Sequence, residues 1–306
     1  GFYAGQNRRV AIAVKVIVVS LVLWASLASN AGDILMNIQS GTIGHFRGWY
    51  VYVSATFMVM SLMLALIPAT GRIRLGANDS APEFSRFAWF SMMFGAGIGV
   101  GMLTYSTAEP LAHFANNPDV IMGATTALDR DNLGAAYKWT LLHYGLTPWG
   151  CYAIVGMSLA YFAYRRDMPL TIRSPFTAVL RPGAGRRVGA VVDAAAILAT
   201  IIGIGVTIGY GVNQLTFGLH QITDWSWLVS NGKPSLTALS LAVIFLTLAA
   251  MLSALSGIGR GIRWLSNLNM ALSWVLLLIF IIFGATAFAG DMFVLGLTEY
   301  VRWLPT

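Results

Sequence analysis

The sequence predicts an all-α integral membrane protein. Three observations lead to this expectation: the composition, the recurrence of long apolar segments, and the distribution of arginine. Of the 306 residues, 57% are hydrophobic and only 10% are charged. A water-soluble domain of this length has too little interior to bury that much apolar surface. We therefore expect the lipid bilayer to surround most of the chain.

Apolar segments of the length that a membrane crossing requires recur along the chain. A bilayer core of about 30 Å needs roughly 20 helical residues. Seven segments meet this requirement: 10–30, 49–69, 86–112, 136–163, 190–218, 236–256 and 268–290. The sequence lacks the alternating segments of about ten residues that are typical of membrane β-barrels. We therefore expect about seven transmembrane helices.

The arginines are distributed unevenly among the connections between these segments. Most of them precede the first segment or lie in the second, fourth and sixth connections, for example Arg8, Arg72, Arg165 and Arg260. By the positive-inside rule, the N-terminus and these connections are expected to be cytoplasmic. The net charge of +7 is thus explained by membrane orientation, and we expect no nucleic-acid partner.

A run of glycines interrupts the third segment, from Gly95 to Gly101. Four glycines alternate with other residues in this run, and each costs up to about 1 kcal/mol of helix propensity. Close helix packing could use such small residues, but it needs fewer of them. We therefore expect the helix to be discontinuous here. Backbone carbonyls freed at a break can bind Na⁺, and freed N–H groups can bind a carboxylate.

Three aromatic residues of the fourth segment could form part of a ligand site. On a helical wheel, Tyr144, Trp149 and Tyr152 fall within an arc of roughly 140°. Aromatic faces attract quaternary ammonium or sulfonium groups, by about 2 kcal/mol or more when the group is desolvated. The alternative is that these rings serve as packing or interface anchors, which is common in membrane helices.

The fifth segment offers two hydroxyl groups at helical spacing. Thr200 and Thr207 lie two turns apart, and no lysine or arginine occurs between Gly189 and Gln214. No fixed cation is therefore available in this segment to replace a sodium ion. Hydroxyl oxygens can bind Na⁺, although threonines in membrane helices commonly bond to a carbonyl of their own helix.

Several motifs along the chain resemble those of the betaine/carnitine/choline transporter family. They are IRLGANDSAPEFS, SMMFGAGIGVG followed by TAEPL, PWGCYAIVG, PLTIRS and GIGRGIRWLSNLNM. The resemblance implies a twelve-helix transporter with two leading helices and two inverted five-helix repeats. It assigns 1–85 to the leading helices and a cytoplasmic loop, 86–290 to the first repeat, and 291–306 to the start of an external segment. The second repeat is expected to lie outside this sequence.

The resemblance also implies roles for individual residues. It assigns substrate binding to Gly97, Ile98, Gly99, Tyr144, Trp149 and Tyr152, and sodium binding to Gly95, Ile98 and Thr200. Two positions depart from the family pattern. Tyr144 stands where a tryptophan is common, and Ile204 stands where sodium-coupled betaine carriers can have a second threonine.

The function implied by the resemblance is secondary active import of zwitterionic quaternary ammonium or sulfonium osmolytes, with Na⁺ as the coupling ion. Glycine betaine and dimethylsulfoniopropionate are examples. A proton-coupled or sodium-independent choline or carnitine carrier or exchanger is the alternative. The expected location is a bacterial inner membrane, and family members often form homotrimers. No phosphate loop, nucleophile elbow or zinc-ligand spacing indicates an enzyme.

A seven-helix receptor or retinal protein would also account for seven segments. A retinal protein needs a lysine in a late segment, and the sixth and seventh segments contain none. A receptor would have an external N-terminus, which the arginine distribution opposes.

Overall fold

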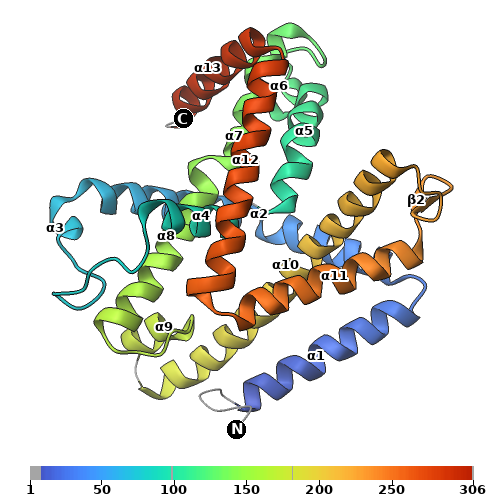
Figure 1. The fold of residues 1–306 in the computed structure, drawn as a ribbon. Helices are drawn as coiled ribbons and strands as arrows, with labels where there is room; N and C mark the ends of the chain where they lie inside the picture. The colour runs from blue at the N-terminus through green and yellow to red at the C-terminus, as the bar shows by residue number, and fades with distance from the viewer. Residues whose placement is uncertain (1–7, 98, 181, 305–306) are drawn as a thin grey trace. The chain divides into compact units, whose positions relative to one another are not determined.

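The computed structural model describes residues 8–97, 99–180 and 182–304, which are mainly helical (Figure 1). The α-helices are α1 (Arg8–Leu27), α2 (Ala31–Leu66), α3 (Pro68–Gly71), α4 (Arg86–Gly97), α5 (Val100–Ala115), α6 (Pro118–Ile121), α7 (Leu133–Tyr144), α8 (Leu146–Ala160), α9 (Arg173–Val179), α10 (Pro182–Thr223), α11 (Leu236–Leu255), α12 (Arg263–Phe283) and α13 (Thr286–Trp303). A 3₁₀ turn η1 (Arg130–Asn132) and π-helical turns η2 (Tyr161–Arg165) and η3 (Ile258–Ile262) adjoin some of them. Strands β1 (Val229–Ser230) and β2 (Lys233–Pro234) form a short antiparallel hairpin.

Five helical stretches among the described residues are long and apolar enough to cross a membrane. They are Val10–Leu27, Ala31–Leu66, Arg187–Thr223, Leu236–Leu255 and Ile258–Phe283. Large apolar side chains on these helices are exposed, as on Leu27 (84%) and Phe283 (82%). Exposed apolar surface of this kind is suited to contact with lipid rather than water. The prediction of an all-α membrane fold is confirmed.

The third and fourth predicted segments are not among these five because each is divided into two shorter helices. In the third segment, α4 and α5 are separated at the glycine run. In the fourth, α7 ends at Tyr144 and α8 begins at Leu146. The sequence analysis treated 136–163 as one continuous helix, and this expectation was wrong.

Proline explains the second interruption. Pro148 has no backbone N–H, so it cannot donate the helical hydrogen bond to the carbonyl four residues earlier, at Tyr144. That carbonyl instead accepts a hydrogen bond of 3.1 Å from the indole Nε1 of Trp149. Gly145 occupies the N-cap of α8 with φ −88° and ψ −139°, outside the helical region. The chain therefore turns between the two helices while the freed carbonyl keeps a partner.

Some helix boundaries differ from the predicted segments. Helix α2 has 36 residues and begins at Ala31, well before the predicted start at 49. Polar side chains in its first half bond to carbonyls of their own helix; the Thr42 hydroxyl donates to Ile38 at 2.7 Å. These bonds satisfy polar groups that made the segment look unlike a membrane helix.

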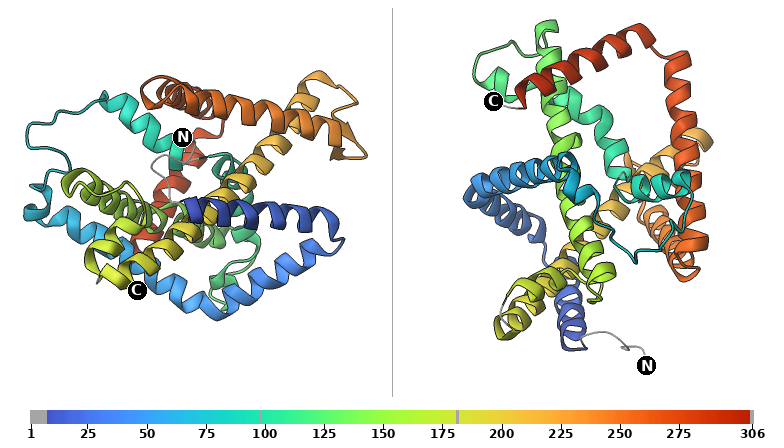
Figure 2. Two further views of the ribbon diagram at one scale, coloured as in Figure 1. Left: turned by 90° about the horizontal axis from the view of Figure 1, so that it is seen from below. Right: turned by 90° about the vertical axis from the view of Figure 1, so that its left-hand side faces the viewer.

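The seventh predicted segment, 268–290, also has different bounds. Helix α12 starts at Arg263 and ends at Phe283, where Gly284 adopts an extended conformation. A separate helix, α13, follows, and Figure 2 shows it turning away from α12. Residues 291–303 thus form the later part of α13. The assignment of 291–306 to the start of an external segment remains a prediction.

By contacts, the chain forms two compact units, which are described separately. One comprises residues 1–80 and 143–202, and the other comprises 81–142 and 203–306. The assignment of 1–85 and 86–290 to leading helices and a repeat remains a prediction.

In the first unit, α2 packs closely on α8. A Cβ atom added at Gly150 would lie 2.6 Å from the Cα atom of Met58. The Ser61 hydroxyl donates to the Gly150 carbonyl at 3.0 Å. This approach is possible because glycine has no side chain, as in other close contacts between membrane helices.

In the second unit, α13 approaches α7 closely at a few positions. A Cβ atom at Gly296 would lie 2.6 Å from the Cβ atom of Tyr137. The rings of Trp139 and Trp303 are 5.0 Å apart between centroids. The backbone of α13 is therefore held directly against side chains of α7.

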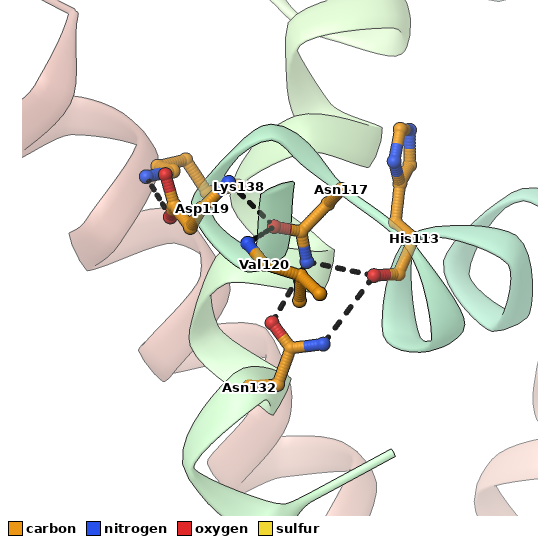
Figure 3. A network of polar contacts seen from close by, with 6 residues as sticks. All are labelled: His113, Asn117, Asp119, Val120, Asn132 and Lys138. Atoms are coloured by element: carbon orange, nitrogen blue, oxygen red, sulfur yellow. Dashed lines mark hydrogen bonds and ion pairs between the residues drawn. The ribbon is translucent and has the colours of Figure 1, made fainter. Parts of the chain in front are cut away.

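A buried pair of asparagines connects the ends of α5, α6 and α7 (Figure 3). Asn117 is 1% exposed and Asn132 is fully buried. The Asn117 amide nitrogen donates to the Asn132 side chain and to the His113 carbonyl, each at 2.7 Å. The Asn117 side-chain oxygen accepts from the backbone N–H groups of Asp119 and Val120, and thereby caps α6.

An ion pair adjoins this network. Lys138 Nζ lies 2.5 Å from Asp119 Oδ2 and over the ring of Trp303 at 5.8 Å. A cavity of about 600 Å³ lies beside the pair, between the α6 region, α7 and α13. Because Lys138 and Asp119 neutralise each other, both can remain largely buried at this end of the unit.

We expect Asn117→Ala to destabilise the protein by about 2 kcal/mol, at the upper end of the cost of removing an N-cap. The substitution removes the cap of α6 and leaves the buried Asn132 amide with fewer partners. The measurement is thermal unfolding of the detergent-solubilised full-length protein. Asn37→Ala, at an exposed position of α2, is the control. Equal stability of both variants would show that the network contributes little.

Candidate functional site

The helix is interrupted where the glycine run predicted a break. Helix α4 ends at Gly97, α5 begins at Val100, and Gly99 between them is extended, with φ −100° and ψ −167°. Ile98 lies outside the described residues. The last carbonyls of α4 have no hydrogen-bond donor within their own helix, and the first N–H groups of α5 have no acceptor within theirs. These are the backbone groups that a cation and a carboxylate would use.

The two halves of the broken helix pack on different helices of the same unit. The N-terminal half, α4, packs on α12. A Cβ atom at Gly95 would lie 3.5 Å from Ser266 Oγ and 3.9 Å from Asn269 Nδ2. Two polar side chains therefore lie beside the residue to which a sodium-binding carbonyl was assigned.

The sequence analysis did not single out Ser266 or Asn269. Their spacing of three residues places them on one face of α12. This polar face in an otherwise apolar segment was the signal that could have identified them.

The C-terminal half, α5, contacts the later part of α10 through individual side chains. A Cβ atom at Gly99 would lie 3.7 Å from the methyl group of Thr207. Further along, the hydroxyl groups of Tyr105 and Tyr210 are 2.7 Å apart. Gln214 Nε2 also donates a hydrogen bond to Thr104 Oγ1. These residues were not predicted to have a role.

In the first unit, Trp149 and Tyr152 form an aromatic pair on α8. Their ring centroids are 5.7 Å apart and the ring planes differ by 37°. Both rings are exposed, Trp149 by 37% and Tyr152 by 58%. Tyr144 belongs to α7, so the helical wheel that placed all three rings in one arc does not apply to it. Tyr144 is linked to the pair through its carbonyl, which accepts a hydrogen bond from the Trp149 indole N–H.

The hydroxyl groups of the two fifth-segment threonines bond within α10. Thr200 donates to the Ala196 carbonyl at 2.7 Å, and Thr207 donates to the Gly203 carbonyl at 3.0 Å. This is the common arrangement that the sequence analysis named as the alternative to sodium binding. A hydroxyl oxygen that donates to a carbonyl still has lone pairs for a cation. The assignment of Thr200 to sodium remains a prediction.

The structure brings the predicted residues together in two groups. Gly95, Gly97 and Gly99 lie at the break in one unit. Trp149 and Tyr152 lie in the other, as does Thr200. The first group offers backbone groups for charged ligands, and the second offers aromatic faces for an onium group. The individual binding roles of these residues remain predictions.

Long apolar helices and a span interrupted at a glycine run define a multi-pass membrane protein of the transporter class. Residues 9–306 match the profile described as BCCT, betaine/carnitine/choline family transporter. The chain belongs to this family, as the motifs predicted. Membership of a transporter family also supports the expectation that the chain is not an enzyme.

Similar proteins in several bacteria carry transporter names. An uncharacterized transporter of Mycobacterium tuberculosis is 36% identical over 302 residues, which cover 96% of this chain and 47% of that protein. The high-affinity choline transport protein of Escherichia coli K12 is 38% identical over 255 residues, 83% of this chain and 36% of that protein. The glycine betaine transporter OpuD of Bacillus subtilis is 31% identical over 287 residues, 94% of this chain and 54% of that protein. The chain thus spans about half or less of the length of these relatives.

Proposed function

We propose that the full-length protein containing this chain is a secondary active transporter. It imports zwitterionic quaternary ammonium or sulfonium osmolytes, of the glycine betaine or dimethylsulfoniopropionate type, together with sodium. The observation that carries the proposal is the interruption of the helix at Gly99 in a chain of this family. A break exposes backbone groups that a continuous helix would use internally.

Each group of residues, taken within its own unit, suits one kind of chemical group that such substrates carry. A carboxylate is attracted to the N-terminal end of α5, where N–H groups and the helix dipole favour negative charge. A quaternary ammonium or sulfonium group is attracted to aromatic faces such as those of Trp149 and Tyr152. Sodium is attracted to carbonyl oxygens at the C-terminal end of α4, which carries the negative end of that helix dipole.

The test of sodium coupling is uptake by proteoliposomes that contain the full-length protein. An inward sodium gradient is expected to increase uptake of labelled glycine betaine at least about tenfold over a potassium gradient of equal size. A factor of ten corresponds to a coupling free energy of about 1.4 kcal/mol. Uptake that is equal under both gradients would contradict sodium coupling.

One observation favours a second candidate, a choline carrier driven by protons or independent of sodium. Ile204 stands where a second threonine would complete a hydroxyl pair one turn from Thr200, and an aliphatic side chain cannot bind a cation. A choline transport protein is among the relatives. The same proteoliposomes distinguish the two candidates. If the second candidate is right, uptake of labelled choline will respond to a pH gradient, or to neither a pH gradient nor a sodium gradient.

We also propose a location and an assembly. The expected setting is a bacterial inner membrane with a cytoplasmic N-terminus, because the arginine-rich connections then face inward. We propose a homotrimer because members of the family often form homotrimers. Chemical crosslinking of the full-length protein in membranes would reveal its assembly.

A further inference from the structure

We infer that Thr104, Tyr105, Tyr210 and Gln214 form a polar clasp that positions the C-terminal half-helix α5 for ligand binding. The clasp consists of the Tyr105–Tyr210 and Thr104–Gln214 hydrogen bonds. The inference rests on the proposed function, because it assigns these residues a role at the same break. They are positioning residues, since they act through the backbone of α5.

The residues on α10 form one continuous stripe. Thr207, Tyr210 and Gln214 are three and four residues apart, a spacing that places them on one face of a helix. All three contact the α5 side of the break: Thr207 at Gly99, Tyr210 at Tyr105, and Gln214 at Thr104. The stripe therefore contacts the chain from Gly99, the N-cap of α5, to Tyr105.

The contact between the tyrosines has a defined geometry. The two rings meet edge to face, with centroids 5.8 Å apart and planes at 84°. The hydroxyl groups at their ends bond to each other at 2.7 Å. In a membrane helix, a hydroxyl group without a partner is costly, so paired hydroxyl groups favour one orientation of the two helices.

The other half of the broken helix has no part in this clasp. Helix α4 packs on α12, where Gly95 faces Ser266 and Asn269. A continuous helix would have to satisfy both packing partners with a single rigid axis. Because the chain is interrupted, α10 can set the direction of α5 independently of α4. That direction decides where the N–H groups and the positive end of the α5 dipole point.

The test is a double-mutant cycle in the full-length protein, reconstituted in proteoliposomes. Tyr105→Phe and Tyr210→Phe each keep the aromatic ring and remove one hydroxyl group. Each is expected to raise the glycine betaine dissociation constant and the half-saturating sodium concentration about three- to tenfold. This is the usual effect of removing one hydrogen bond, about three- to tenfold in an equilibrium constant. The maximal uptake rate should change less than twofold. The double variant should bind glycine betaine and sodium no more weakly than either single variant, because both substitutions remove the same hydrogen bond.

A second pair of variants separates positioning from general packing. Thr104→Val keeps the shape of the side chain but removes the hydroxyl oxygen that accepts from Gln214. Thr104→Ser keeps that oxygen and removes a methyl group. A clasp predicts a larger loss of affinity in Thr104→Val, whereas a packing role predicts a larger loss in Thr104→Ser. Tyr52→Phe, at a position of α2 that is 76% exposed, is the matched control and should bind normally.

The outcomes distinguish the clasp from the proposed function. If the unmodified protein binds no onium compound, the proposed function fails. If it binds, but the tyrosine variants have unchanged affinities or additive losses, the clasp inference is overturned. A greater loss in Thr104→Ser than in Thr104→Val would overturn it as well.

Discussion

Trp149→Ala is expected to weaken glycine betaine binding to the full-length protein about 30-fold or more. A desolvated cation–aromatic contact is worth roughly 2 kcal/mol, which corresponds to this factor. The substitution also removes the indole N–H group that bonds to the Tyr144 carbonyl at 3.1 Å. The order of the turn between α7 and α8 should therefore be lost together with the aromatic face. Isothermal titration of the purified protein with glycine betaine measures the effect.

Three further variants assign this loss to its cause. Trp149→Phe keeps an aromatic face but cannot donate to Tyr144, so we expect an intermediate affinity. Tyr152→Ala should weaken glycine betaine binding about as much as Trp149→Ala, because the two rings lie side by side. Trp49→Ala, on a lipid-exposed part of α2 where the ring is 59% exposed, is the control. Normal affinity in both Trp149→Ala and Tyr152→Ala would exclude the aromatic pair from the site.

Gly150→Ala is expected to destabilise the protein by about 1–3 kcal/mol, the usual cost of overpacking a well-packed contact. The added methyl group would lie 2.6 Å from the Cα atom of Met58 and 2.9 Å from its backbone nitrogen. Backbone atoms cannot rotate away as a side chain can, so α2 and α8 must separate. The measurement is the unfolding temperature of the detergent-solubilised full-length protein, which should fall by several degrees.

The same helix provides the matched control. Gly156 also lies on α8, but a Cβ atom there would meet no other atom within 4 Å. Gly156→Ala should leave the unfolding temperature unchanged or raise it, because alanine favours a helix over glycine by up to about 1 kcal/mol. Equal effects at Gly150 and Gly156 would show that helix propensity, and not packing on α2, decides the result.

The class of fold and the place of the break in the third segment could both be predicted from the amino-acid sequence. Both depend on local properties of the chain. Long apolar segments need a lipid solvent wherever they pack. The glycine run disfavours a continuous helix for reasons that lie within the run itself, and the structure confirms the interruption at Gly99. The second interruption, before Pro148, is also encoded locally, because proline has no N–H group to donate.

The side chains that support the break could not be predicted in this way, because they are brought to it by the packing of distant helices. Gly95 meets Ser266, and Tyr105 meets Tyr210, although each pair is more than a hundred residues apart in the sequence. Helical periodicity shows which residues share a face, but not which other helix that face will contact. The choice depends on how closely two backbones can approach, as at Gly150 and Met58. It also depends on which polar groups find partners away from water, and these conditions exist only once the helices are packed.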